Sequence, residues 1–160
     1  MISSVHVLNP ARSKFKLKRK VKDKVVYVIG VFDLFHAGHV RLLKRARALG
    51  DKLVVAVNGD EMVAQYKRRP YISEEERLEV VRSCRYVDEA FIIKDFDNKD
   101  MIIKYRIKII VHGDDWTGDS YLKQIRLTPE FIEKYAIELK FLPYTKGISS
   151  SGLIERIKNS

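Results

Sequence analysis

An apolar run that leads through a glycine into two histidines constrains the fold of this chain more than any other feature. Residues 25–29 are rich in valine and stop at a glycine, which is typical of a buried strand. Residues 40–49 are predicted to form a helix, so His36 and His39 fall where a strand leads into a helix. The free N–H groups and the dipole of a helix N-terminus favour an anion, and Gly38 lets the backbone approach a ligand closely. The turn therefore predicts a phosphate-binding site, and a triphosphate is the ligand that it suits.

Strand and helix patterns alternate from residue 25 onward. The expected strands span residues 25–30, 52–57, 87–93, 108–112 and 138–142, and the expected helices span residues 38–49, 60–66, 74–83, 99–105, 130–136 and 149–158. Ser73 and Glu76 form a capping box, and Thr128 precedes a proline at a helix start. The block 118–131 has no clear place in this pattern. The alternation predicts an α/β fold: a single Rossmann-like domain, a mostly parallel sheet with helices on both faces, and ligands at the carboxyl ends of the strands.

The composition indicates one globular domain that is not secreted. The chain has 160 residues, of which 46% are apolar, and this is enough for a single core. No apolar run approaches 18 residues and no signal peptide is visible, so we expect no membrane span and a cytoplasmic location. Cys84 is the only cysteine, which excludes an internal disulfide and a metal site built on a cysteine cluster.

The positive charge is concentrated at the N-terminal end. Residues 1–24 contribute +7 of the formal net charge of +10, so we expect a basic, flexible extension (1–24) followed by a folded domain (25–160). The extension is either a solvated leader or a contact for nucleic acid, an acidic membrane surface or an upstream domain. A nucleic-acid-binding module is thus the alternative from another functional class, and it predicts salt-dependent binding that is lost when residues 1–24 are deleted. We do not expect nucleic acid as a partner.

The two histidines of the turn have three interpretations: ordinary polar residues, metal ligands or donors to phosphate. A metal site needs at least one more ligand at a suitable spacing, and the other histidines, His6 and His112, offer no recognisable second half of such a motif. We therefore predict no metal held by the protein, and we expect His36 and His39 to donate hydrogen bonds to the oxygens of a departing pyrophosphate.

Residues 30–39 resemble the signature of the HxGH nucleotidyltransferase superfamily, whose members transfer a nucleoside monophosphate from an NTP and release pyrophosphate. Three further segments are similar to the cytidylyltransferase branch of that superfamily. Residues 111–116 resemble its cytosine-reading segment, residues 85–89 its dimer-interface segment and residues 147–151 its C-terminal phosphate-binding signature. The resemblance implies transfer of CMP from CTP by a homodimer, with Mg²⁺ on the triphosphate and few or no protein ligands to that metal.

The resemblance also implies a set of site residues. The catalytic residues are His36, His39 and Lys67; the nucleotide-binding residues are Gly30, Val31, Phe32, Gly38, Arg77, Gly113, Asp114, Asp115, Ser149 and Ser150; the acceptor-binding residues are Asp33, Lys67 and Trp116. Simpler roles exist for some of them. Asp33 is also a normal turn residue, and an N-cap explains one of the serines. Arg77 could pair on the surface with Glu74 or Glu76, and Trp116 suits core packing and a pocket wall equally.

Two of these roles have a physical rationale. Negative charge builds on the α-phosphate during transfer, and a fixed cation such as Lys67 lowers that barrier. An oxygen of residues 113–115 that accepts a hydrogen bond from the cytosine amino group distinguishes cytosine from uracil, which has no donor there.

The acceptor half of the site is less defined. Compact bacterial glycerol-3-phosphate cytidylyltransferases share the patterns of residues 85–89 and 113–116, but their last signature begins Arg-Thr-Glu where this chain has Tyr144-Thr145-Lys146. Phosphonoalcohol and aminoalkylphosphonate cytidylyltransferases often carry tyrosine there, and Lys146 is one candidate to replace the lost charge. We therefore expect a small phosphate- or phosphonate-bearing acceptor, first glycerol 3-phosphate giving CDP-glycerol, with 2-aminoethylphosphonate or 2-hydroxyethylphosphonate as alternatives. An adenylyltransferase of the same superfamily is a further alternative, against which residues 114–116 argue.

Overall fold

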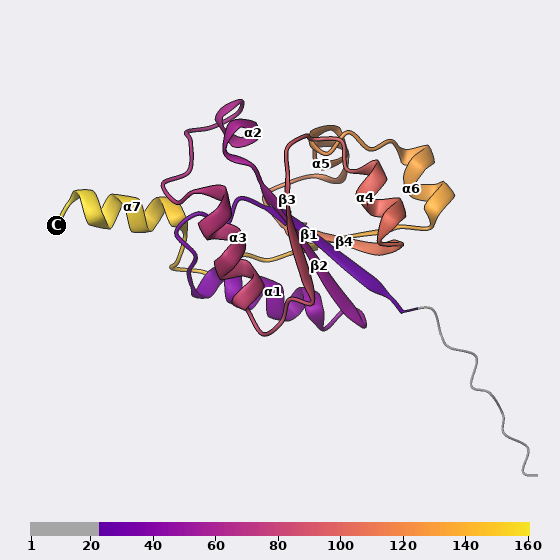
Figure 1. Ribbon diagram of the computed structural model, residues 1–160, viewed down its shortest axis with the longest axis horizontal. Coiled ribbons are helices and arrows are strands. Elements are labelled where there is room, and N and C mark those ends of the chain that lie inside the picture. The colour runs from indigo at the N-terminus through magenta and orange to yellow at the C-terminus, as the bar shows by residue number, and fades with distance from the viewer. Residues whose placement is uncertain (1–22) are drawn as a thin grey trace, which may run out of the picture.

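The computed structural model describes residues 23–160, which form five strands and seven helices (Figure 1). The predicted basic extension, residues 1–24, lies almost entirely outside the described residues, so what was expected of it stays a prediction.

The strands form one sheet in which every neighbouring pair is parallel. They are β1 (Val25–Gly30), β2 (Lys52–Asn58), β3 (Glu89–Ile93), β4 (Ile107–Gly113) and β5 (Glu138–Leu142), in the spatial order β3-β2-β1-β4-β5. The order reverses beside β1, because the chain moves outward from β1 to β3 and then returns to the other side of β1 with β4. In such sheets the ligand binds at the carboxyl ends of the strands next to this reversal.

The helices cover both faces of the sheet, as the alternating pattern predicted. They are α1 (Ala37–Arg47), α2 (Asp60–Ala64), α3 (Glu74–Ser83), α4 (Lys99–Lys104), α5 (Gly118–Gln124), α6 (Pro129–Tyr135) and α7 (Ser150–Lys158). Figure 1 shows α1 and α3 on one side of the sheet and α4, α5 and α6 on the other.

Side chains that alternate along β1 divide the core into two layers. Val26 and Val28 belong to the cluster that contains Leu43 of α1 and Val81 of α3. Tyr27 and Ile29 belong to a second cluster, which contains Ile102 of α4 and residues of α5. Because successive residues of a strand point to opposite faces, an apolar run such as residues 25–29 requires cover on both sides.

The helices α3 and α6 begin at the predicted caps. One further helix, α5, was not predicted from the sequence. The Ser73 hydroxyl accepts from the backbone N–H of Glu76, and the Thr128 hydroxyl accepts from that of Phe131, as expected. The unassigned block 118–131 contains α5, which begins after a capping box of Thr117 and Ser120. Its Tyr121 and Leu122 are buried, so this block completes the core beneath β4.

The last helix, α7, extends away from the body of the molecule (Figure 1). None of its residues is buried. Its first turn is nevertheless anchored, because the Ser150 hydroxyl donates to the carbonyl oxygen of Asp33 at 2.7 Å. This bond brings the N-terminus of α7 beside the turn between β1 and α1.

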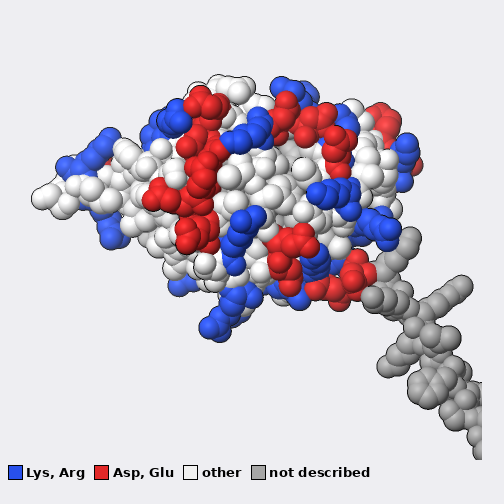
Figure 2. Space-filling model, in the orientation of Figure 1, with Lys and Arg blue, Asp and Glu red and all other residues white. Residues whose placement is uncertain are grey.

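No helix within residues 23–160 is long and apolar enough to cross a bilayer. Figure 2 shows both acidic and basic side chains on the face in view, and the basic ones do not form a continuous patch on that face.

Candidate active site

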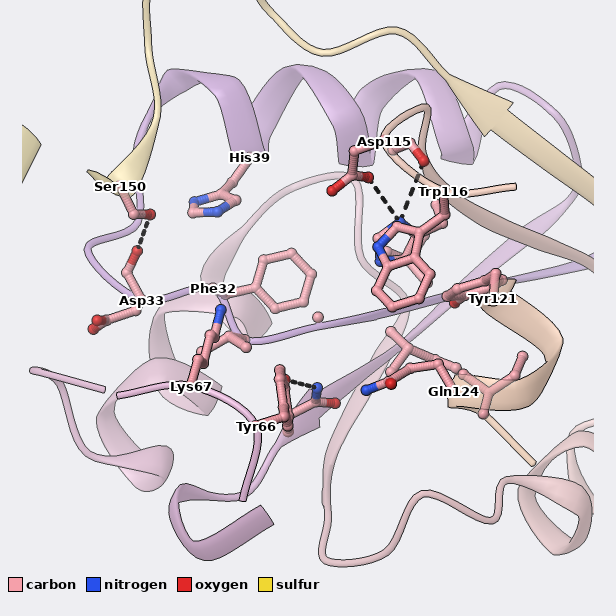
Figure 3. Close-up of a pocket in the computed structure, with 18 of the residues that line it drawn as sticks. Phe32, Asp33, His39, Tyr66, Lys67, Asp115, Trp116, Tyr121, Gln124 and Ser150 are labelled. Carbon is pink, nitrogen blue, oxygen red and sulfur yellow. Dashed lines mark hydrogen bonds and ion pairs between the residues drawn. The ribbon is translucent and has the colours of Figure 1, made fainter. Parts of the chain in front are cut away.

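Two adjoining cavities open at the carboxyl ends of the strands, and Figure 3 shows the residues that line the inner one. The inner cavity, of about 570 Å³, lies over the ends of β1, β2 and β4 and is closed by α5. The outer cavity, of about 770 Å³, lies between the N-termini of α1 and α7. His39, Lys67 and Ser150 line both cavities and therefore mark the junction between them.

The two histidines form the capping box of α1, which fixes their tautomers. Nδ1 of His36 accepts from the backbone N–H of Gly38 at 3.0 Å, and Nδ1 of His39 accepts from the backbone N–H of His36 at 3.3 Å. A neutral ring that accepts at Nδ1 carries its proton on Nε2. Each histidine consequently presents one Nε2–H donor, which agrees with the predicted role as donors to phosphate oxygens.

The surroundings of His39 hold it neutral. Its ring stacks on His36 with centroids 4.0 Å apart and meets the Phe32 ring edge-on at 5.4 Å. Burial, and then the neighbouring His36, lower the pKa of His39 to about 3, and burial lowers the pKa of His36 as well. At neutral pH both rings are therefore uncharged donors in the free chain.

The turn that carries this pair is conformationally strained. Phe32 has a φ of 57° and Leu34 a φ of 49°, a region that residues with a side chain rarely adopt. Phe32 is nonetheless 4% exposed, and its ring lies so close to Gly30 that a Cβ there would come within 2.9 Å of it. Gly30 and Phe32 both line the inner cavity. Their contacts with each other set the shape of the turn.

Asp33 ties this turn to the loop that bears Lys67. Its carboxylate accepts from the backbone N–H groups of Tyr71 and Ile72 and from the Arg68 guanidinium, each at 3.0 Å. Burial alone would raise the pKa of Asp33, but the two N–H groups and Arg68 outweigh it and lower that pKa. Asp33 thus holds the loop that bears Lys67 next to the junction. Asp33 also lines the inner cavity, and its predicted contact with the acceptor stays a prediction.

Lys67, predicted to be catalytic, lies on the wall of both cavities. Figure 3 shows its side chain directed toward Phe32 and the space beneath His39. Partial burial, followed by the nearby Arg68, lowers the pKa of Lys67. The negative charge of a phosphate at the junction would favour the protonated form of Lys67 and so offset this lowering.

Arg77 lies beneath the site and lines neither cavity. Its side chain is 1% exposed, and its guanidinium donates to the carbonyl oxygens of Val31 and Asn58 and to the carboxylate of Asp60. The alternative of a surface ion pair with Glu74 or Glu76 is therefore wrong. The structure also gives Arg77 a different place from the predicted nucleotide contact, because it supports the Val31 backbone from below.

The segment after β4 packs against the residue that stands where an arginine was expected. The Tyr144 ring lies so close to Gly113 that a Cβ there would clash with it, and the Tyr144 hydroxyl donates to Asp115 at 3.1 Å. Asp114 accepts from the backbone N–H of Tyr144 at 3.3 Å and lines neither cavity, so its predicted contact with the nucleotide has no support in its position. Gly113 and Asp115 do line the inner cavity.

Of two further residues from the sequence analysis, Trp116 lines a cavity and Lys146 does not. Trp116 packs against the core and also lines the inner cavity, so its predicted contact with the acceptor stays a prediction. Lys146 is exposed and lines neither cavity, so its position does not support the replacement of a lost phosphate contact.

The serines at the start of α7 line the outer cavity, as Gly38 does. Ser149 is the N-cap, since its hydroxyl accepts from the backbone N–H of Gly152 at 3.0 Å. The Ser150 hydroxyl donates to the carbonyl oxygen of Asp33, and Ser150 and Ser151 both line the two cavities. The outer cavity is therefore enclosed by the N-termini of two helices, an arrangement that suits a polyanion.

Sequence reasoning missed most of the inner cavity wall. Asn58, Tyr66 and His112 line it from β2, the loop after α2 and β4, and Tyr121 and Gln124 line it from α5. Figure 3 shows Gln124 extending into the cavity from the side opposite Tyr66. A cap signal, Thr117 followed by Ser120, was present for α5, but no local pattern shows that its side chains meet those of β2.

Within residues 23–160 there is no cluster of three or more His, Cys, Asp or Glu side chains that could hold a metal ion.

Comparisons with known proteins show which family this chain is similar to. A family model described as cytidylyltransferase-like matches residues 27–156, which include nearly the whole described domain. The ethanolamine-phosphate cytidylyltransferase of Dictyostelium discoideum is 42% identical over 147 residues, which cover 86% of this chain and 39% of that protein. The glycerol-3-phosphate cytidylyltransferase of Bacillus subtilis (strain 168) is 40% identical over 136 residues, which cover 84% of this chain and 97% of that protein.

A solved structure has the same fold. The lipopolysaccharide core biosynthesis protein from Thermoplasma volcanium GSS1 is 30% identical, with a TM-score of 0.63, and the match covers 79% of this chain and 99% of that chain.

Proposed function

Because the chain belongs to the cytidylyltransferase-like family, we propose that it transfers CMP from CTP to glycerol 3-phosphate, forming CDP-glycerol and pyrophosphate. The match over 97% of the Bacillus subtilis glycerol-3-phosphate cytidylyltransferase supports this acceptor. The ethanolamine-phosphate cytidylyltransferase is as similar in sequence, but this chain spans only 39% of its length.

One observation carries the proposal: the two cavities meet at His39 and Lys67. The outer cavity offers donors at two helix N-termini and suits a triphosphate. The inner cavity offers aromatic faces and neutral polar groups, which suit a small organic acceptor. A phosphorus atom at the junction is within reach of a nucleophile from one cavity and a leaving group in the other.

In this assignment, an oxygen of the acceptor phosphate attacks the α-phosphorus of CTP in line with the leaving group. The new P–O bond forms while the bond from the α-phosphorus to its bridging oxygen breaks, and that oxygen departs on pyrophosphate with the electron pair. The acceptor is already an anionic nucleophile, so no covalent intermediate on the enzyme is needed.

The chain's own residues then act by positioning and by neutralising charge. His36 and His39 donate their Nε2–H groups to oxygens of the departing pyrophosphate, and Lys67 offsets the charge that builds on the α-phosphate. Mg²⁺ accompanies CTP, and when bound it adds further positive charge at the triphosphate. Gly113 and Asp115, which line the inner cavity, are the proposed contacts for cytosine.

The direct test is pyrophosphate release with CTP and Mg²⁺ and a panel of acceptors. The panel contains glycerol 3-phosphate, phosphoethanolamine, phosphocholine, 2-aminoethylphosphonate and 2-hydroxyethylphosphonate, with ATP replacing CTP in parallel. We expect glycerol 3-phosphate to give the highest kcat/KM and ATP to be inactive. A higher value for a phosphonate or for phosphoethanolamine would replace the proposed acceptor, and turnover with ATP alone would overturn the assignment of the nucleotide.

A further inference from the structure

Two buried polar atoms in the wall of the inner cavity have no hydrogen-bond partner in the described part of the chain. They are Oδ1 of Asn58 and the hydroxyl oxygen of Tyr121. Asn58 is 7% exposed and Tyr121 is 2% exposed. Buried polar atoms in native proteins almost always have a hydrogen-bond partner. Two unpaired polar atoms in the wall of one cavity therefore indicate a ligand that supplies the missing partners.

Asn98 lines the same cavity, and both polar atoms of its side-chain amide have hydrogen-bond partners. Oδ1 of Asn98 accepts from the Tyr27 hydroxyl at 2.8 Å, and its Nδ2 donates to the carbonyl oxygen of Phe96 at 2.9 Å. Asn58 instead has one partner only, the Tyr66 hydroxyl at 3.1 Å from its Nδ2. Exchanging the amide oxygen and nitrogen of Asn58 still leaves one of the two atoms unpaired.

We infer that Asn58 and Tyr121 select the acceptor by hydrogen-bonding the neutral hydroxyl groups of a polyol phosphate. This assignment rests on the proposed function, since it names the acceptor class of the same site. Gln124, whose side chain extends into the same space, adds a third neutral polar group (Figure 3). The aromatic rings of Tyr66 and Phe96, 5.8 Å apart, line the same cavity and offer apolar faces to the carbon skeleton.

The charges around the inner cavity favour a neutral polyol over an ammonium group. Two carboxylates line it, and both are engaged: Asp33 by Arg68 and two backbone N–H groups, and Asp115 by the Tyr144 hydroxyl. Lys67 and Arg68 in the same wall are cations, which attract the acceptor phosphate and repel an ammonium. A hydroxyl, in contrast, both donates to Asn58 Oδ1 and accepts from Tyr121.

The test removes hydrogen-bonding groups from the enzyme and hydroxyl groups from the acceptor. The variants are Tyr121→Phe and Asn58→Leu, and Tyr135→Phe, on α6 and outside both cavities, is the matched control. Each is assayed with CTP against glycerol 3-phosphate and against propyl phosphate, which has the same carbon chain without hydroxyls. Binding without turnover is followed by the fluorescence of Trp116, the only tryptophan, whose ring lies 6.0 Å from that of Tyr121.

We expect Tyr121→Phe to raise the KM and the binding constant Kd for glycerol 3-phosphate by about 10-fold, the effect of one lost hydrogen bond. The same variant should leave propyl phosphate and the KM for CTP unchanged, and it should unfold at no lower temperature than the wild type, because it deletes an unpaired hydroxyl. Tyr135→Phe should change none of these quantities.

Equal effects on both acceptors, a raised KM for CTP alone, or preferential binding of phosphocholine by the wild type would overturn the inference. Asn58→Leu must show the same dependence on acceptor hydroxyls, which guards against a general loss of folding in either variant. If glycerol 3-phosphate binds with this dependence but no pyrophosphate is released, the inference holds and the proposed reaction fails.

Discussion

Individual side chains at the junction of the two cavities are each held by a specific neighbour. His36 and His39 both accept a backbone N–H at Nδ1, which directs their remaining proton to Nε2. The HxGH spacing indicated a phosphate site, but it could not fix these tautomers, because they depend on the backbone geometry of the turn. Lys67 was identified by resemblance alone, and its loop has no helix or strand pattern that would have placed it.

The charge of Lys67 is expected to act in the transition state. Lys67→Ala should lower kcat by about 100-fold with a smaller change in the KM for CTP, because it removes a cation from the developing charge on the α-phosphate. Steady-state pyrophosphate release measures both constants. Lys104→Ala, on α4 and away from both cavities, is the matched control. A variant that changed only the KM for CTP would instead make Lys67 a ground-state contact.

The neutral state of His39 predicts a pH dependence of stability. Its pKa is about 3 in the folded chain, against an ordinary value of 6.5, so the unfolded chain binds more protons between these values. The free energy of unfolding should therefore decrease as the pH falls below about 6.5, by about 1–2 kcal/mol from this residue between pH 7 and pH 5. Urea unfolding at both pH values measures this loss, and His39→Asn should make it smaller. An identical loss in the variant would show that His39 is not the titrating group.

Among the elements, strands were predicted better than the loops between them. Strand 138–142 has the predicted bounds, and β1 begins and ends as expected. The strand predicted at 87–93 begins two residues later, at Glu89. The backbone N–H of Val87 donates to the carbonyl oxygen of Cys84 in a turn, and the Asp88 carboxylate accepts from the backbone N–H of Leu53. These are contacts between distant segments, which periodicity along the chain does not reveal.

The inner cavity shows the same limit more strongly. Its wall combines the end of β2 with α5, a helix that the sequence left unassigned. Asn58 reads as an ordinary strand end and Tyr121 as an ordinary aromatic residue. Only the fold shows that each has a polar atom without a partner in the same space.

The loop after α2 depends on Asp33, which connects it to the turn before α1. Asp33→Asn should lower kcat by about 10-fold and destabilise the fold by about 1–2 kcal/mol, because the loop that bears Lys67 loses charge-assisted hydrogen bonds. Ser73→Ala is the control, since loss of the α3 cap costs about 1 kcal/mol but should leave kcat unchanged. Chemical denaturation and steady-state kinetics on both variants separate the two effects. Equal kcat values for the wild type and Asp33→Asn would contradict this positioning role.

For the whole molecule, the parallel α/β architecture was predicted from the alternation of elements, and the structure confirms it. The homodimer rests on the resemblance of residues 85–89 and remains a proposal. That segment leads directly into β3, which lies at one end of the sheet and pairs only with β2.

We expect sedimentation equilibrium to give twice the mass of one chain at micromolar concentration. Arg85, exposed in the segment before β3, offers a test: Arg85→Glu should weaken association, whereas Lys104→Glu on α4 should not. A monomer with full activity at the same concentration would rule out the dimer.

The central claim is that CTP and glycerol 3-phosphate react across the junction at His39 and Lys67. Phosphorus NMR of the protein with CTP, Mg²⁺ and glycerol 3-phosphate tests it by observing the product itself. We predict equal amounts of pyrophosphate and of CDP-glycerol, recognised by two coupled diphosphate-diester signals, and no such signals with ATP. Unchanged CTP and glycerol 3-phosphate after prolonged incubation, or pyrophosphate released with CMP and no diester, would contradict the account.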